Sequence, residues 1–155
     1  MVEGMIHYLH REQIIPAPVD KVWGYFCNPK NLNEITPPDM NFEILQGGDV
    51  EMYEGQIIEY RVEFIRGIRS LWLTEISHVW ERTYFVDEQR VGPYRFWYHE
   101  HGFEEHLAGT RMTDRVAYII PFGILGDLLN AFWISRRLEN IFNFRRQKIF
   151  ELFGE

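Results

Sequence analysis

Two histidines one residue apart, His99 and His101, are the side chains of this sequence best suited to chemistry. They lie in residues 94–104, an aromatic-rich stretch whose alternation predicts a β-strand. Side chains two residues apart in a strand share a face, so we expect Trp97, both histidines and Phe103 on the more apolar, inward face. An imidazole there suits a general acid or base, or a polar anchor for a ligand.

The next predicted strand, residues 110–120, supplies a carboxylate for these imidazoles. If Ala108-Gly109 forms a two-residue loop, Asp114 lies opposite Phe103 and on the same face as the histidines. A nearby carboxylate orients a histidine tautomer and raises the imidazole pKa. His99, His101 and Asp114 are therefore the candidate catalytic residues.

Two other interpretations of this cluster stay open. One is a hydrogen-bonded pair that serves only the packing beneath a helix. The other is a metal site in which His99 and His101 chelate an ion and Asp114 or another residue supplies the third ligand, but no cysteine cluster supports it. The sequence therefore predicts no metal and no cofactor. Nucleophilic catalysis has no support either, because Cys27 is the lone cysteine and the serines have no identifiable base.

The composition indicates a pocket for an apolar molecule. Aromatic residues make up 16% of the chain, and large rings commonly line cavities for such ligands. The net charge of −7 argues against a general binder of nucleic acids or anionic membranes. A basic cluster late in the chain is spread round several sides of a predicted helix, which indicates a solvated surface; it comprises Arg136, Arg137, Arg145, Arg146 and Lys148.

The elements that must position these side chains are marked by turn signals. A first strand is predicted over residues 5–15; Pro16 and Pro18 end it and open a helix that continues to Phe26. A second short helix is predicted over residues 31–35. The remaining predicted strands cover residues 42–45, 56–65, 68–79, 82–87, 94–104 and 110–120.

A long amphipathic helix over residues 125–153 completes the chain. At roughly 1.5 Å per residue it is about 40 Å long, enough to cross a sheet. Its apolar stripe is predicted to contain Leu128, Leu129, Phe132, Leu138, Ile141, Phe142, Ile149 and Phe153. This order of elements predicts an α+β domain in which a curved antiparallel sheet of about six or seven strands grips the helix. No linker or repeat interrupts the chain, so we expect residues 1–155 to form a single domain.

The expected location is the cytoplasm. No cationic leader followed by an apolar run opens the sequence, so no secretory signal is predicted. The most apolar stretch, residues 119–134, contains Pro121 and Asp127 and is shorter than the ~20 residues of a spanning helix. We expect no stable membrane insertion, and the oligomeric state stays open.

Five segments spanning nearly the whole chain follow a family pattern: PAPVDKVWGYFCNPKNLNEITPP, LWLTEI, FVDEQRVGPYRFWYHEHGF, GTRMTDRVAYIIPFG and LENIFNFRRQKIFELF. They resemble the SRPBCC superfamily, also called START-like or birch-pollen-allergen-like. The nearest branch is the bacterial polyketide cyclase/dehydrase-like or ligand-binding SRPBCC proteins. The most specific part is GPY-x-x-W-x-H-x-H-x-F.

This resemblance implies the helix-grip fold and a pocket for a small apolar molecule such as a sterol, lipid, polyketide, quinone or plant hormone. A minority of the superfamily are enzymes with chemistry at differing positions, so it implies no catalytic residue here. The positions that match the pocket are Trp72, Thr74, Phe85, Asp87, Gln89, Trp97, His99, His101, Phe103, Met112, Asp114 and Tyr118. Phe142 of the helix stripe completes the predicted ligand-binding set.

The alternation of the strands disagrees with the resemblance at two positions of one strand, Trp72 and Thr74. A tight turn at Arg66-Gly67 pairs Trp72 with Arg61 and places Trp72 on the face opposite to Tyr60. A bulge near Ser70 would bring Trp72 to the pocket face. The face that Trp72 occupies stays open at this point.

The sequence thus predicts a protein that binds a small hydrophobic molecule (a lipid, polyketide, quinone or similar) without catalysis. The histidines, Asp114 and Gln89 would orient one polar end of the ligand. One alternative is an aromatase/cyclase- or lyase-like enzyme in which a pocket histidine moves protons. Another is a partner-binding module with a filled cavity, whose contact patch would contain Phe122, Leu125 and Trp133.

Overall fold

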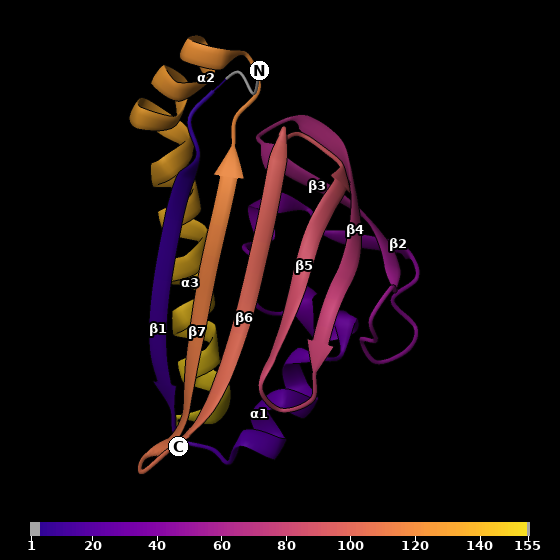
Figure 1. Cartoon of the computed structure of the whole chain (residues 1–155), viewed down its shortest axis with the longest axis vertical. Coiled ribbons are helices and arrows are strands. Elements are labelled where there is room, and N and C mark those ends of the chain that lie inside the picture. The colour runs from indigo at the N-terminus through magenta and orange to yellow at the C-terminus, as the bar shows by residue number, and fades with distance from the viewer. Residues whose placement is uncertain (1–3, 155) are drawn as a thin grey trace.

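The computed structural model describes residues 4–154, in which a seven-stranded sheet packs against a long C-terminal helix (Figure 1). The strands are β1 His7–Ile15, β2 Glu43–Gln46, β3 Ile57–Ile65, β4 Ile68–Trp80, β5 Tyr84–Val91, β6 Phe96–His106 and β7 Gly109–Ile119. The helices are α1 Val19–Phe26, the 3-10 helices η1 Pro29–Asn33 and η2 Pro38–Met40, α2 Gly123–Leu129, the π-helical segment η3 Asn130–Ile134 and α3 Ser135–Phe153. Neighbouring strands are antiparallel in the order β1-β7-β6-β5-β4-β3-β2, and the predicted α+β helix-grip fold is confirmed.

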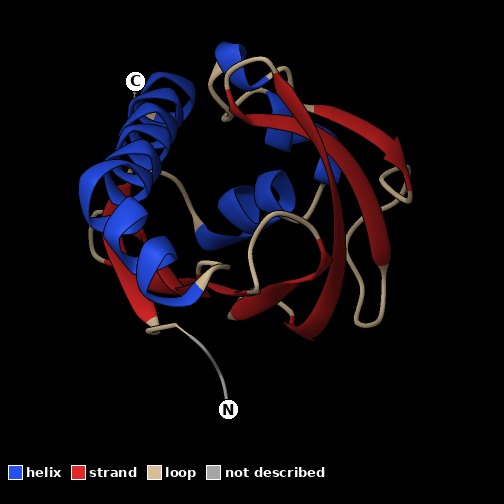
Figure 2. Ribbon diagram, turned by 90° about the horizontal axis from the view of Figure 1, so that it is seen from above, coloured by secondary structure: helices blue, strands red, loops and turns tan. Residues whose placement is uncertain are grey.

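The sheet curves round an interior, and α3 closes its open side (Figure 2). One apolar cluster joins α3 to β6 and β7; it includes Trp97, Val116, Tyr118, Leu138, Ile141 and Phe142. A second cluster joins α1 to the opposite ends of β6 and β7 and to the end of α3; it includes Val22, Trp23, Phe26, Phe85, Phe103, Met112 and Ile149. These clusters hold the helices against the concave face of the sheet.

The hairpin between β6 and β7 differs from its predicted register by two residues. The turn lies at Leu107-Ala108, because His106 pairs with Gly109. Asp114 consequently lies opposite His101 and not opposite Phe103. Side chains alternate with a period of two. A shift of two residues therefore changes every predicted pair but leaves every residue on its predicted face.

The hairpin between β3 and β4 settles the face of Trp72. Its register shifts between Val62 and Ile65, and beyond this irregularity Trp72 pairs with Tyr60 and not with Arg61. The prediction from a regular tight turn was therefore wrong. The extra residue reverses the alternation and turns Trp72 to the face of Tyr60, as the resemblance implied.

Strand β5 begins two residues later than predicted and continues to Val91. Arg82 has a φ of 63°, a left-handed conformation that belongs to the turn after β4. The predicted strand over residues 82–87 therefore counted turn residues as strand. The later end adds Gln89 to β5, which also contains Asp87 as predicted.

The C-terminal helix is interrupted by the π-helical turn η3. Beyond it the predicted stripe is buried, at Leu138, Ile141, Phe142, Ile149 and Phe153. Before and within it the prediction was wrong, because Leu128 and Leu129 of α2 and Phe132 of η3 are exposed. A π turn takes more residues than an α turn, so a stripe extrapolated at 3.6 residues per turn leaves the buried face there. Within residues 4–154, no helix is both long enough and apolar enough to cross a membrane.

Candidate functional site: a cavity with a histidine–aspartate network

A cavity of about 150 Å³ lies between the concave face of the sheet and α3. Much of its wall is aromatic, which accounts for part of the high aromatic content of the chain: Tyr25, Phe26, Phe42, Tyr60, Phe64, Trp72, Phe85, Tyr94, Trp97 and Phe142. Its polar wall comprises Asn28, Asn31, Thr36, Thr74, Asp87, His99, His101 and Arg145. The cavity thus combines an apolar surface with a small set of charged and titratable groups.

The cavity brings together most of the predicted ligand-binding residues but not all of them. Those on its wall are Trp72, Thr74, Phe85, Trp97, His99, His101 and Phe142. Those that do not line it are Gln89, Phe103, Met112, Asp114 and Tyr118.

Each residue outside the wall has another partner. The Gln89 amide donates to the Tyr94 carbonyl at 2.6 Å and accepts from the Tyr94 N–H at 3.1 Å, which ties the loop between β5 and β6 together. The Tyr118 hydroxyl donates to Asn130 Oδ1 at 2.8 Å. Phe103 and Met112 pack in the cluster beneath α1. The Gln89 side chain is thus engaged within the loop and does not line the cavity, and its role as a ligand anchor stays a prediction.

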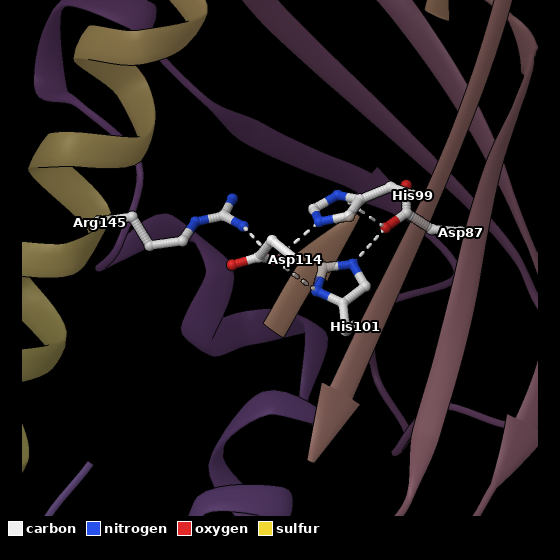
Figure 3. Close-up of polar contacts among 5 residues, drawn as sticks. All are labelled: Asp87, His99, His101, Asp114 and Arg145. Carbon is white, nitrogen blue, oxygen red and sulfur yellow. Dashed lines mark hydrogen bonds and ion pairs between the residues drawn. The ribbon is translucent and has the colours of Figure 1, made fainter. Parts of the chain in front are cut away.

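The two histidines and two aspartates form a closed network at the cavity (Figure 3). His99 Nε2 lies 2.7 Å from Asp114 Oδ1, and His101 Nε2 lies 2.6 Å from Asp87 Oδ2. An ionised carboxylate only accepts hydrogen bonds, so both imidazoles donate through Nε2. The two Nδ1 atoms are each 3.5 Å from the other carboxylate, His99 from Asp87 and His101 from Asp114.

Sheet register explains this arrangement. Asp87 lies directly opposite His99, and Asp114 directly opposite His101. The short hydrogen bonds are the diagonal ones. Each histidine bonds to a carboxylate two residues away from the position directly opposite it on the neighbouring strand. Diagonal neighbours are within reach of long side chains. Each imidazole therefore hydrogen-bonds to the diagonal carboxylate and lies 3.5 Å from the directly opposite one.

The imidazole rings are also stacked. Their centroids are 3.7 Å apart with 28° between the planes. The ring of Phe85 stacks on the other side of His101 at 4.1 Å. This stack fixes the plane of His101 from both sides and holds its Nε2 toward Asp87.

Burial governs the protonation of the network. Burial and the neighbouring His99 lower the pKa of His101 to about 4, despite the hydrogen bond with Asp87. Sequence reasoning expected the carboxylate to raise an imidazole pKa, and for His101 that was wrong because desolvation of the charged ring outweighs the attraction. Burial alone raises the pKa of Asp114, but the hydrogen bond from His99 and nearby positive charge lower it to about 2.

Two residues of the site were not predicted from the sequence to take part in it. Asp87 matched the family pocket but received no role, although it shares the alternation of Phe85. Arg145 was predicted to be solvated, yet its side chain is only 11% exposed and its Nη1 lies 3.9 Å from Asp114. A signal existed in its spacing, because Arg145 falls between Phe142 and Ile149 on the buried stripe.

Three potential metal ligands meet at one face of the network. In the part of the chain that the structure describes, the potential ligand atoms of Asp87, His99 and His101 lie within 4.8 Å of one another. The third ligand would be Asp87 and not Asp114. However, the stacked rings direct their in-plane lone pairs side by side, and an ion at about 2.1 Å from both nitrogens requires one ring to rotate. The predicted absence of a metal stays a prediction.

Solved structures share this fold over nearly the whole chain. A protein from Chromobacterium violaceum is 10% identical with a TM-score of 0.71, and the match covers 96% of this chain and 97% of that one. The major latex-like protein 151 from Panax ginseng is 13% identical with a TM-score of 0.71, covering 97% and 99%. Ara h 8.0201 is 17% identical with a TM-score of 0.65, covering 95% and 99%.

These likenesses show the fold, which is the helix-grip fold that the resemblance implied. No protein-family model and no curated protein matches the sequence.

Proposed function

We propose that this helix-grip protein binds a small, largely apolar molecule between the sheet and α3 without transforming it. The observation that carries the proposal is the cavity itself, about 150 Å³ in volume, with a mostly apolar wall rich in aromatic rings and a polar group at Asp87, His99 and His101. Small-molecule sites have this composition, since apolar walls supply affinity and a few polar groups fix orientation. Burial of apolar surface contributes about 25 cal/mol per Å² before ordering costs.

The volume narrows the class of ligand. A dry cavity of about this size accepts a molecule such as benzene, whereas sites for drug-sized ligands span roughly 300–1,000 Å³. Of the expected classes, a quinone-like or other single-ring compound therefore fits better than a long-chain lipid or a polycyclic polyketide.

Two measurements test the proposal. Purified protein is extracted and searched by mass spectrometry for a co-purifying small molecule. It is also titrated with toluene while tryptophan fluorescence is recorded, because Trp72 and Trp97 line the cavity. We expect saturable binding. The proposal fails if nothing co-purifies and toluene leaves the fluorescence unchanged.

A cavity-filling variant locates the binding. Val62 is buried on the cavity wall, and Val62→Phe places a ring in that space. The same substitution at Val50, which is 57% exposed, is the matched control. Binding of toluene is expected to be lost in the first variant and kept in the second.

One observation favours a second candidate, the aromatase/cyclase- or lyase-like enzyme. Both histidines line the cavity, and each has a carboxylate within 2.7 Å that fixes its ring. A general base needs this access and orientation. Exchange of the α-protons of cyclohexanone in D₂O, followed by NMR, tests this candidate. Exchange that is faster than in buffer and is abolished by His101→Ala supports the enzyme. Exchange at the buffer rate excludes the enzyme for this ketone.

The interaction-module alternative loses its main support. The predicted contact residues Phe122, Leu125 and Trp133 are indeed exposed. The cavity, however, is not filled by the aromatic side chains around it. A cavity with free space favours a ligand-binding protein over a partner-binding module with a filled cavity.

A further inference from the structure

The carboxylate of Asp87 is the part of the network most open to the cavity. Its side chain is 19% exposed, compared with 5% for His99 and 7% for His101. Asp114 is 10% exposed and does not line the cavity. A ligand in the cavity therefore meets Asp87 before the other carboxylate.

One cation, Arg145, also lies on the cavity wall, and its buried Nε has no hydrogen-bond partner among residues 4–154. The only Lys or Arg on the cavity wall formed by residues 4–154 is Arg145, and its ion-pair contact is with Asp114, at 3.9 Å. Its guanidinium also lies over the ring of Phe142, 5.0 Å from the centroid. The described contacts of the Asp87 carboxylate are with the two imidazoles, at 2.6 Å from His101 Nε2 and 3.5 Å from His99 Nδ1. In residues 4–154 no Lys or Arg lies within ion-pair distance of the Asp87 carboxylate, so it presents negative charge to the cavity beside the two imidazoles, and Arg145 acts on it only at longer range.

Starting from the proposed binding function, we propose that the polar end of the ligand is a hydrogen-bond donor held by Asp87. A protonated amine is preferred to a neutral hydroxyl, and a carboxylate is disfavoured. Hydrogen bonds between ionised partners are roughly twice as strong as neutral ones, and a buried charge is tolerated when it is paired. The wall also contains the indole rings of Trp72 and Trp97, and aromatic rings attract cations.

A set of one-ring probes that differ only in their polar end tests this preference. Wild-type protein is titrated by calorimetry at pH 7 and fixed ionic strength with benzylamine, benzyl alcohol, benzoate and toluene. We expect benzylamine to bind most tightly, with a dissociation constant at least about tenfold below that of benzoate. Equal binding of all four probes, or tightest binding of benzoate, overturns the proposal.

Substitution of the carboxylate assigns the preference to its source. Asp87→Asn keeps the shape and removes the charge, and is expected to reduce the advantage of benzylamine over benzyl alcohol to less than about threefold. Asp49→Asn, at a side chain that is 92% exposed, is the matched control and should keep the wild-type order. Asp87→Glu retains the charge and should retain a preference for the amine. An unchanged order in Asp87→Asn overturns the role of Asp87.

Toluene separates this inference from the function on which it rests. If toluene binds and the amine has no advantage, the donor preference is wrong and the binding function stands. If no probe binds, including toluene, both are wrong. The wild-type ranking decides the preference even if Asp87→Asn does not fold.

Discussion

His101 and Asp114 are buried in the same network, and both have a pKa below the ordinary value. The pKa of His101 is about 4 in the folded protein and 6.5 ordinarily, so between these values the unfolded chain binds a proton that the folded chain does not. The same holds for Asp114 between its ordinary 3.8 and about 2. Acid therefore favours the unfolded state through both groups, in successive pH windows.

We predict that the free energy of unfolding is highest near neutral pH and falls as the pH decreases from about 6.5 to 2, by on the order of 2–3 kcal/mol for each group. Urea denaturation at pH 7, 5 and 3 measures it. His101→Gln should remove the decrease between about pH 6.5 and 4, whereas His10→Gln, at an exposed position, should retain it. A wild-type unfolding free energy that is constant from pH 7 to 4 contradicts the prediction.

At the scale of elements, one buried hydrogen bond fastens the π-helical segment η3 to the sheet. The Tyr118 hydroxyl in β7 donates to Asn130 Oδ1, the first residue of η3, and both side chains are buried. Asp127 in α2 adds a second attachment, because it lies 2.9 Å from His7 Nε2 in β1. These contacts position the start of the long helix over β1 and β7.

Asn130→Ala is predicted to lower the free energy of unfolding by about 1–3 kcal/mol, because it leaves the buried Tyr118 hydroxyl without its acceptor. Urea denaturation measures the loss, with Asn143→Ala at an exposed position of α3 as control. Adding Tyr118→Phe should recover part of the loss, since no unpaired hydroxyl then remains. Additive effects of the two substitutions would show that the hydrogen bond contributes nothing.

At the scale of the whole molecule, the cavity couples ligand binding to stability. A ligand that binds only the folded state stabilises it, by about 2.7 kcal/mol at a concentration 100 times its dissociation constant. We predict that benzylamine at such a concentration raises the thermal midpoint by roughly 5–10 °C. Calorimetry measures the shift, and Val62→Phe should not show it. An equal shift in that variant would place the binding outside the cavity.

The sequence alone determined the architecture and the face of the histidines. Alternation and turn residues are local signals, so they predicted seven strands and a long helix, with boundaries that shifted by a few residues. The face of His99, His101 and Asp114 was correct even though the hairpin register was wrong by two, because alternation has a period of two.

Only the tertiary structure decided which side chains meet. The pattern of apolar residues reports neither the irregularity between Val62 and Ile65 nor the π turn at η3. The first decides the face of Trp72, and the second decides the exposure of Phe132. Asp87 became the partner of His101 through the pairing of β5 with β6, which brings together residues 14 apart in the chain. The desolvation that lowers the pKa of His101 exists only when sheet and helix enclose the network, so the charge of the site is a property of the fold and not of the sequence pattern.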